Sequence, residues 1–307
     1  MGRNKITVVG AGNVGATVAQ LLVYKKLGDV CLIDVMEGVA KGKALDLTEA
    51  SPLDNYDAEI VGSSSYEASA NSDIVVITAG LARKPGMTRE DLLQKNAAII
   101  KDVSSNIIKH SPNCFVIVVT NPLDTMSFVA KEETNLAKDR IVGMAGVLDS
   151  TRFRSFIAME LGVCMDDVVA TVLGLHGEDM VPMPRFSSVA GIPITELLSS
   201  EKIDAIVERT KHGGAEIVKL LQTGSAFYAP AASVVNMVES ILLDRKRVTP
   251  AAVYLEGEYG LNGLFMGVPI VLGKKGVEKV LELELTADEK VALQQSAESV
   301  KKSMKLL

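Results

Sequence analysis

Short apolar runs alternate with longer amphipathic segments through the first half of the chain. Strands with no alternation of apolar and polar residues are typical of a parallel sheet that is buried on both faces. Five such runs occur, at 5–10, 29–34, 58–62, 73–80 and 114–120. Segments of helical length lie among them, at 13–27, 37–50, 89–109 and 122–137. This alternation predicts a doubly wound parallel α/β sheet with right-handed crossovers.

The pattern changes in the second half of the chain. A strand that ends in a turn is expected at 167–177, and a proline-interrupted hairpin at 179–194. Two antiparallel strands are expected at 248–260 and 264–273, with Leu-Asn-Gly as the turn between them. Helical patterns occupy 148–162, 201–222, 227–243 and 286–305, and Lys-His-Gly-Gly near 212 suggests a helix kink or turn. These mixed elements predict a second, α+β unit.

Composition and charge narrow the classes of function. The chain has 307 residues, of which 48% are hydrophobic and 23% charged, as in ordinary globular proteins. The net charge is −6, and no run of Lys or Arg could follow a phosphate backbone, so a nucleic-acid partner is not expected. An acidic protein repels small anions at long range, so an anionic ligand would need a few local arginines.

The positions of the cysteines and the lengths of the apolar runs indicate the cellular compartment of the protein. Cys31, Cys114 and Cys164 lie far apart, without a CxxC motif or a Cys/His cluster, so neither a disulfide framework nor a metal site is expected. Buried thiols suit a reducing cytosol, which predicts a cytoplasmic protein. The apolar runs are too short to span a bilayer, and because the first run comes as early as 5–10, no signal peptide is expected.

The sequence GAGNVG at 10–15 follows the first expected strand and opens a helix. In a dinucleotide site Gly10 permits the tight turn, Gly12 lets the backbone approach a pyrophosphate, and Gly15 allows close packing of helix on strand. The helix N-terminus then offers unpaired N–H groups to the phosphates. Asp34, at the end of the next strand, would bind the ribose hydroxyls and repel a 2′-phosphate, which favours NAD over NADP. Structural glycines in a plain strand–helix turn, or a flavin-binding Rossmann domain, would share this motif.

Three residues could supply the chemistry of an NAD enzyme. Asp149 and Arg152 are three apart at a helix start and so share one face, although an intrahelical ion pair alone would explain them. His176 follows an apolar run and precedes a glycine, unlike His110 and His212, which lie in helical segments. Alcohol oxidation needs a base for the hydroxyl proton, a carboxylate can orient that base, and a guanidinium matches a substrate carboxylate.

The segment 81–91, LARKPGMTRED, adds further cations directly after a buried strand. Arg83, Lys84 and Arg89 surround the pair Pro85-Gly86. A solvated surface loop would explain this charge as well as an anion site would. Together with Arg152, however, these arginines could bind both ends of an anionic substrate.

Six motifs occur in this order: GAGNVG, Asp34, ITAGLARKPGMTRED, VTNPLD, VLDSTRFR and LGLHGEDMVP. They resemble the malate dehydrogenases of the lactate/malate dehydrogenase superfamily, and more narrowly its lactate-dehydrogenase-like bacterial group. The resemblance covers essentially the whole chain. It implies an NAD-binding Rossmann domain at residues 1–145 and a catalytic α+β substrate domain at residues 146–307.

The resemblance also implies roles for the matching residues. His176 resembles the proton acceptor and Asp149 its partner. Arg152 resembles the residue that binds the C1 carboxylate, Arg89 the residue that polarises the reacting carbonyl, and Asn121 a contact of both substrate and cofactor. The expected cofactor contacts are Gly10, Gly12, Asn13, Val14, Gly15, Asp34, Asn96, Val119 and Asn121.

Arg83 occupies the position that distinguishes members of the superfamily, since lactate dehydrogenases usually have Gln there and malate dehydrogenases Arg. Oxaloacetate carries a second carboxylate where pyruvate has a methyl group. An unpaired charge in a closed site would change selectivity on the order of a thousandfold or more. The resemblance implies that this loop closes over the substrate.

The implied activity is the reversible oxidation of L-malate to oxaloacetate with NAD, by a cytoplasmic homotetramer or homodimer. A lactate or other 2-hydroxyacid dehydrogenase, or a non-catalytic NAD-binding sensor, would share most of the motifs. An NAD-dependent glycosidase would need a metal-ligand cluster that the sequence lacks. Leu175 and Glu178 stand where the family usually has Gly and Asp, so the detailed geometry beside His176 is expected to differ.

Overall fold

The computed structural model describes residues 2–81 and 88–307. Within these residues the centre is a nine-stranded sheet with the order β14-β13-β12-β6-β5-β4-β1-β2-β3. Six of its strands are parallel: β1 (Lys5–Val9), β2 (Asp29–Ile33), β3 (Ile60–Ser63), β4 (Ile74–Ile77), β5 (Phe115–Val118) and β6 (Ile141–Gly143). Their order changes direction between β1 and β4, which is the doubly wound Rossmann arrangement. The fold class predicted for the first half is therefore confirmed.

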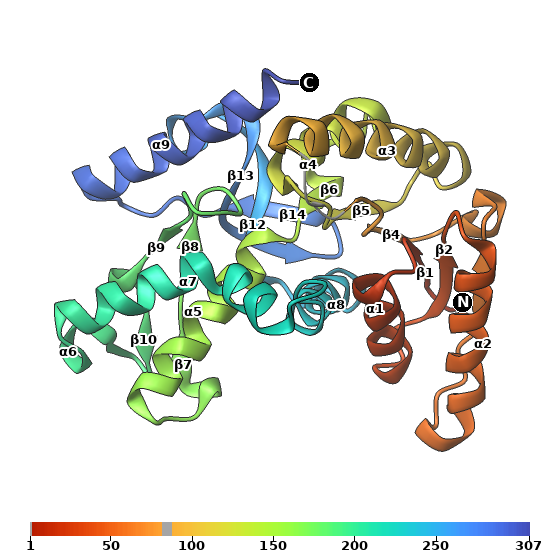
Figure 1. The fold of residues 1–307 in the computed structure, drawn as a ribbon, viewed down its shortest axis with the longest axis horizontal. Coiled ribbons are helices and arrows are strands. Elements are labelled where there is room, and N and C mark those ends of the chain that lie inside the picture. The colour runs from red at the N-terminus through yellow and green to blue at the C-terminus, as the bar shows by residue number, and fades with distance from the viewer. Residues whose placement is uncertain (1, 82–87) are drawn as a thin grey trace.

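Helices cover both faces of the parallel strands (Figure 1). Alternate residues of β1 face two different apolar clusters: Ile6 and Val8 belong to one, and Val9 to the other. The first cluster includes α1 (Asn13–Tyr24) and α8 (Tyr228–Leu242), and the second includes α3 (Arg89–His110) and α4 (Leu123–Thr134). Helix α2 (Glu37–Asp54) packs beside β2 and β3. Burial on both faces explains why these strands show no polar alternation.

Three strands from the second half extend the same sheet. β12 (Arg247–Glu256) pairs antiparallel with β6 through Ala252 and Gly143, and β13 (Asn262–Gly273) and β14 (Gly276–Val280) follow. The sequence predicted the antiparallel pair but not β6 or β14, because β6 has only three residues and because Glu278 and Lys279 interrupt the apolar residues of β14. The turn was also misplaced. It comes at 257–260, where Gly257, Tyr259 and Gly260 have positive φ, and Asn262 already pairs with Glu256.

The second half contains α5 (Ala145–Leu161) and further elements outside the nine-stranded sheet. They include β7 (Val168–Val169), β8 (Val172–Leu173), β9 (Val181–Pro182), β10 (Ser188–Val189), β11 (Ile192–Pro193), α6 (Ile194–Leu197), α7 (Ser200–Leu221) and α9 (Ala287–Met304). Of these, α7, β7 and β8 pack against α5. The single strand predicted at 167–177 is wrong, since β7 pairs with β10 and β8 pairs with β9 in a separate sheet. Val168 and Val172 are both buried in the cluster around α5, so the two pieces share one apolar pattern.

Two helices of the second half bear on the site. α7 is continuous through Gly213 and Gly214, so the kink or turn expected there is absent. α9 begins with a capping box, in which Thr286 accepts from the backbone N–H of Glu289. It runs beside β13 and reaches α4 (Figure 1).

Among the helices that the structure describes, none is long and apolar enough to cross a membrane.

Candidate active site

The turn between β1 and α1 forms a backbone cradle at the carboxyl edge of the sheet. Gly10 has a φ of +103°, which L side chains rarely adopt. A Cβ on Gly15 would lie 1.8 Å from the carbonyl oxygen of Gly10, so α1 could not pack this closely with any other residue there. Gly12 is the N-cap and α1 starts at Asn13 and Val14, which leaves the helix N-terminus facing the turn. The cradle fits the pyrophosphate of a dinucleotide.

Asp34 lies beside this cradle. Its Oδ2 accepts a hydrogen bond from the backbone N–H of Ala11 at 2.7 Å, and its Oδ1 accepts from that of Met36 at 2.9 Å. Each carboxylate oxygen can accept a second bond, so both can still bind ribose hydroxyls. The next two residues, Val35 and Met36, are exposed and apolar, where an enzyme for NADP needs a cation to bind the 2′-phosphate. The surroundings of Asp34 therefore fit NAD.

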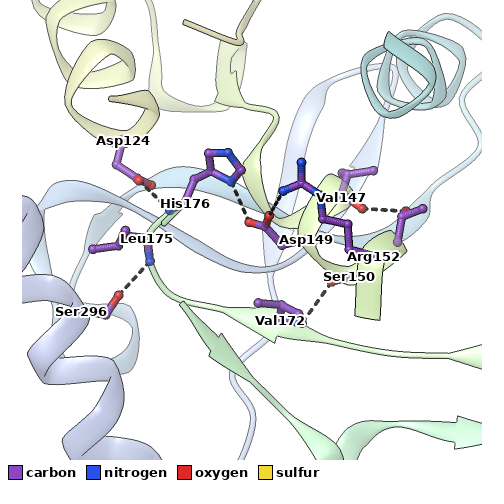
Figure 2. Close-up of polar contacts among 10 residues, drawn as sticks. Asp124, Val147, Asp149, Ser150, Arg152, Val172, Leu175, His176 and Ser296 are labelled. Atoms are coloured by element: carbon purple, nitrogen blue, oxygen red, sulfur yellow. Dashed lines mark hydrogen bonds and ion pairs between the residues drawn. The ribbon is translucent and has the colours of Figure 1, made fainter. Parts of the chain in front are cut away.

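A second group of residues joins α5 to the turn after β8 (Figure 2). His176 Nδ1 lies 2.8 Å from Oδ2 of Asp149, and Arg152 Nη1 lies 3.5 Å from the other carboxylate oxygen. Asp149 is 2% exposed, whereas the His176 side chain is 16% exposed. The structure therefore brings together the three residues that the sequence singled out. With Nδ1 directed at Asp149, His176 presents Nε2 for proton exchange.

The turn that carries His176 is held by four other elements. Gly174 exchanges two backbone hydrogen bonds with Gly267 of β13, and the backbone N–H of Leu175 donates to Ser296 Oγ of α9 at 2.8 Å. The backbone N–H of His176 donates to Asp124 Oδ2 of α4 at 2.9 Å, while its ring contacts α5 (Figure 2). A base fixed in this way needs little reorganisation before proton transfer.

The charges around His176 and its burial have opposite effects on the pKa of the imidazole. Burial alone lowers the pKa of the imidazole, but the charge and hydrogen bond of Asp149 raise it, and the net pKa lies above its ordinary value. Arg152 partly opposes this increase, and Asp124 adds to it. Burial also lowers the pKa of Arg152 from its ordinary value, an effect that Asp149 reduces. Asp149 therefore favours the imidazolium form of His176.

Arg152 lies against two glycines of α7. A Cβ on Gly213 would lie 3.2 Å from Cδ of Arg152, and one on Gly214 would lie 3.6 Å from its Nη2. Among the described residues, Nε of Arg152 is buried without a hydrogen-bond partner. The guanidinium therefore keeps donors for an anionic ligand, and the bare helix backbone gives it room.

A cavity of about 540 Å³ opens beside His176. Arg89, the first residue of α3, and Asn121, just after β5, line it together with His176. Val119 is half-buried at the end of β5. Leu175 and Glu178, which stand where the family usually has Gly and Asp, also line this cavity. They therefore change the cavity wall and not the His176–Asp149 pair.

Asn96 is only 1% exposed, and its side-chain amide contacts the protein backbone. Its Oδ1 accepts from the backbone N–H of Leu81 at 2.8 Å, and its Nδ2 donates to the carbonyl oxygen of Asn121 at 2.7 Å. Asn96 therefore positions Asn121, next to the expected cofactor. Arg83, expected to bind the distal carboxylate, lies outside the described residues.

Some residues at the site were not predicted from the sequence. Asp124 and Ser296 contact the turn of His176, and Lys43 donates to the carbonyl oxygen of Ala11 at 2.7 Å beside the glycine cradle. These contacts join residues far apart in sequence, and no spacing reveals them. The glycine pair of α7 did give a signal, because two glycines inside a helical pattern require a reason. Within residues 2–81 and 88–307, no group of three His, Cys, Asp or Glu could hold a metal ion.

A histidine paired with a carboxylate has a specific use beside a nicotinamide. Hydride transfer from an alcohol leaves a hydroxyl proton that a base must remove. The Rossmann sheet, the glycine cradle and this base therefore define the class of the protein, a dinucleotide-dependent dehydrogenase with a histidine base.

Comparison with known proteins agrees with this class. The sequence profile of the lactate/malate dehydrogenase NAD-binding domain matches residues 4–143, and that of the family's α/β C-terminal domain matches residues 146–307. The chain belongs to the lactate/malate dehydrogenase family.

Relatives and solved structures match over nearly the full length. The malate dehydrogenase of Chlorobium phaeobacteroides is 59% identical over 304 residues, with 99% of this chain and 98% of that protein covered. The structure of Picrophilus torridus malate dehydrogenase in its apo form is 52% identical with a TM-score of 0.97, covering 99% and 97% of the two chains. Cryptosporidium parvum lactate dehydrogenase, complexed with lactic acid and NAD, is 40% identical with a TM-score of 0.97, covering 100% and 98%. Backbone similarity alone therefore does not separate the two activities.

Proposed function

We propose that the protein catalyses the reversible oxidation of L-malate to oxaloacetate with NAD. The observation that carries the proposal is the Asp149–His176 pair, whose Oδ2 and Nδ1 atoms lie 2.8 Å apart. The pair accompanies a Rossmann sheet in which Asp34 lies beside the glycine cradle and fits NAD. Full-length relatives at 54–59% identity carry the name malate dehydrogenase, in agreement with the activity predicted from the sequence.

The glycine turn at 10–15 and Asp34 would hold NAD, which would supply the acceptor for the hydride from C2 of malate. Neutral His176 takes the hydroxyl proton at Nε2, while Asp149 holds the ring and stabilises the resulting imidazolium. Arg152 binds the C1 carboxylate through its guanidinium, whose Nε has no partner among the described residues. In the reverse direction protonated His176 returns the proton, and Arg89 polarises the carbonyl from the cavity wall. Asn121 lies between the substrate and the cofactor.

Substrate choice depends on Arg83 in this proposal. A small dicarboxylate needs one cation at each end, and Arg83 supplies the second by the resemblance to malate dehydrogenases. A lactate dehydrogenase on the same scaffold would lack that cation. The arginine at this position therefore favours oxaloacetate over pyruvate.

We also propose a cytoplasmic homo-oligomer that divides into domains at residues 1–145 and 146–307. Large apolar side chains are exposed on α2, including Leu53 at 84%, and on α7, including Leu220 at 76%. A subunit contact would bury them. Cys31 and Cys114 are buried free cysteines, which suits a reducing compartment.

An absorbance assay tests the proposed activity directly. Consumption of NADH or NADPH is followed with oxaloacetate or pyruvate as the second substrate. NADH with oxaloacetate should be the fastest of the four combinations. A preference for pyruvate would favour a lactate dehydrogenase, and no turnover with bound NADH would favour a sensor.

A further inference from the structure

Asp124 is a buried carboxylate that the proposed mechanism does not use. It is the second residue of α4 and is 4% exposed. Its Oδ2 accepts the backbone N–H of His176 at 2.9 Å, so it contacts the residue that carries the base (Figure 2). Its Oδ1 is buried and has no hydrogen-bond partner among the described residues. A buried carboxylate with one unsatisfied oxygen is costly, so it requires an explanation.

The surroundings only partly compensate this cost. The pKa of Asp124 is raised to about 6, because the effect of burial outweighs the opposing effects of the backbone N–H and the charge of His176. The first turn of a helix, where Asp124 lies, favours negative charge. The carboxylate is therefore ionised at neutral pH but titrates close to the range in which histidine titrates.

Two carboxylates thus approach His176 from different elements. Asp149 of α5 contacts the ring, and Asp124 of α4 contacts the backbone. Arg152 lies beyond Asp149. Its positive charge lowers the pKa of His176, against the effect of both carboxylates. The other charged side chains that line the cavity come from α3, from the turn after His176 and from α9: Arg89, Glu178, Asp179 and Lys302. Among the residues that the structure describes, Asp124 and Asp149 are the two buried carboxylates that are hydrogen-bonded to His176.

We propose that Asp124 is a second positioning carboxylate for the base: it fixes the backbone of His176, and its negative charge favours the imidazolium. The inference rests on the proposed function, in which protonated His176 binds oxaloacetate and neutral His176 binds malate. Asp124 thereby shifts the proton equilibrium of the site toward the ketone-binding form.

The variant Asp124→Asn separates the two effects. The amide oxygen can still accept the N–H of His176, but the charge is gone. The pKa of His176 should fall by about one unit. The alkaline limb of the pH profile for oxaloacetate reduction and the acid limb of that for malate oxidation should both move to lower pH by this amount. Asp288→Asn is the matched control, because Asp288 is also the second residue of its helix and is exposed, and this variant should leave both profiles unchanged.

An NMR titration of the imidazole provides a readout that does not depend on activity. The chain has three histidines, so the His176 signal can be assigned by comparison with a His176→Asn sample. In the wild-type protein the His176 signal should show a second, smaller step near pH 6 from Asp124. This step should be absent in Asp124→Asn. If that variant does not fold, the wild-type titration alone decides.

The outcomes are distinct. A single-step wild-type titration, or pH profiles that do not move in a folded Asp124→Asn protein, would overturn the inference while leaving the proposed activity intact. An equal shift in Asp288→Asn would assign the effect to overall charge and would also overturn it. Absence of oxaloacetate reduction in the wild-type protein would instead overturn the proposed function, and the NMR titration would still test the link between Asp124 and His176.

Discussion

In the proposed function, the chemistry depends on His176 as the base. Replacing it with Asn removes the base but keeps a polar side chain of similar size. We expect kcat to fall by about 10²- to 10⁴-fold, because that is the usual contribution of a positioned acid–base group. NADH affinity, measured by fluorescence titration, should stay the same. His212→Asn is the control, since His212 is exposed on α7, and a comparable loss there would contradict the role of His176.

In the proposed function, Asp34 selects NAD over NADP. Its carboxylate would repel a 2′-phosphate, and the adjacent exposed residues supply no cation to offset that repulsion. Asp34→Ser should therefore lower kcat/KM with NADH and raise it with NADPH, so that the ratio of the two falls by about tenfold or more. Steady-state kinetics with both cofactors measure this ratio. An unchanged ratio would show that Asp34 does not select NAD.

At the scale of single elements, the glycine pair of α7 destabilises its helix but leaves room for Arg152. A glycine inside a helix costs about 1 kcal/mol relative to alanine. Gly213→Ala should therefore raise the free energy of unfolding if nothing else changed. Its Cβ, however, would lie 3.2 Å from Cδ of Arg152 and 3.6 Å from the Phe156 ring, so the arginine must shift.

We expect Gly213→Ala to raise KM for oxaloacetate about tenfold, because a small displacement of a substrate-binding group is enough for such a loss. NADH binding should not change. Gly42→Ala is the matched control, since a Cβ on that helical glycine would meet nothing within 4 Å. It should stabilise the protein and leave KM unaltered. If Gly213→Ala also leaves KM unaltered, the glycine does not serve Arg152.

Element prediction succeeded where burial left a pattern in the sequence. The five long apolar runs of the first half became parallel strands because both faces of the sheet are covered. β6 was missed because three residues contain too few positions to show a pattern, and β14 because Glu278 and Lys279 interrupt its apolar residues. β7 and β8 were merged into one predicted strand. Asp149, Arg152 and His176 could be grouped through chemistry and resemblance. The bond from His176 to Asp124 could not, because a side chain reaches a backbone group 52 residues away.

At the scale of the whole molecule, the two halves share one sheet and one core. β12 joins β6, and the cluster that contains Leu22 of α1 also contains Val234 and Ile241 of α8. The sequence predicted two consecutive units but could not show that they share a sheet, since strand pairing between distant segments has no local signal. Folding of the NAD-binding half should therefore depend on the second half.

Leu22→Ala tests this coupling. Leu22 is fully buried, so its truncation should cost about 3 kcal/mol. Hydrogen exchange should then show lost protection in β1 and in α8 together, because both line the cluster. Val291→Ala on α9 is the control, since that side chain is 56% exposed and its loss should change stability little. Lost protection confined to residues 1–145 would contradict a shared core.

The most direct test of the account is the ratio of kcat/KM for oxaloacetate to that for pyruvate, measured with NADH in the wild-type protein and in Arg83→Gln. We expect the wild-type ratio to be on the order of a thousand or more, since the distal carboxylate needs a cation in a closed site. The substitution should reduce this ratio by about a hundredfold or more, through slower turnover of oxaloacetate. A wild-type preference for pyruvate, or an unchanged ratio in Arg83→Gln, would contradict the assignment of this site to a four-carbon diacid.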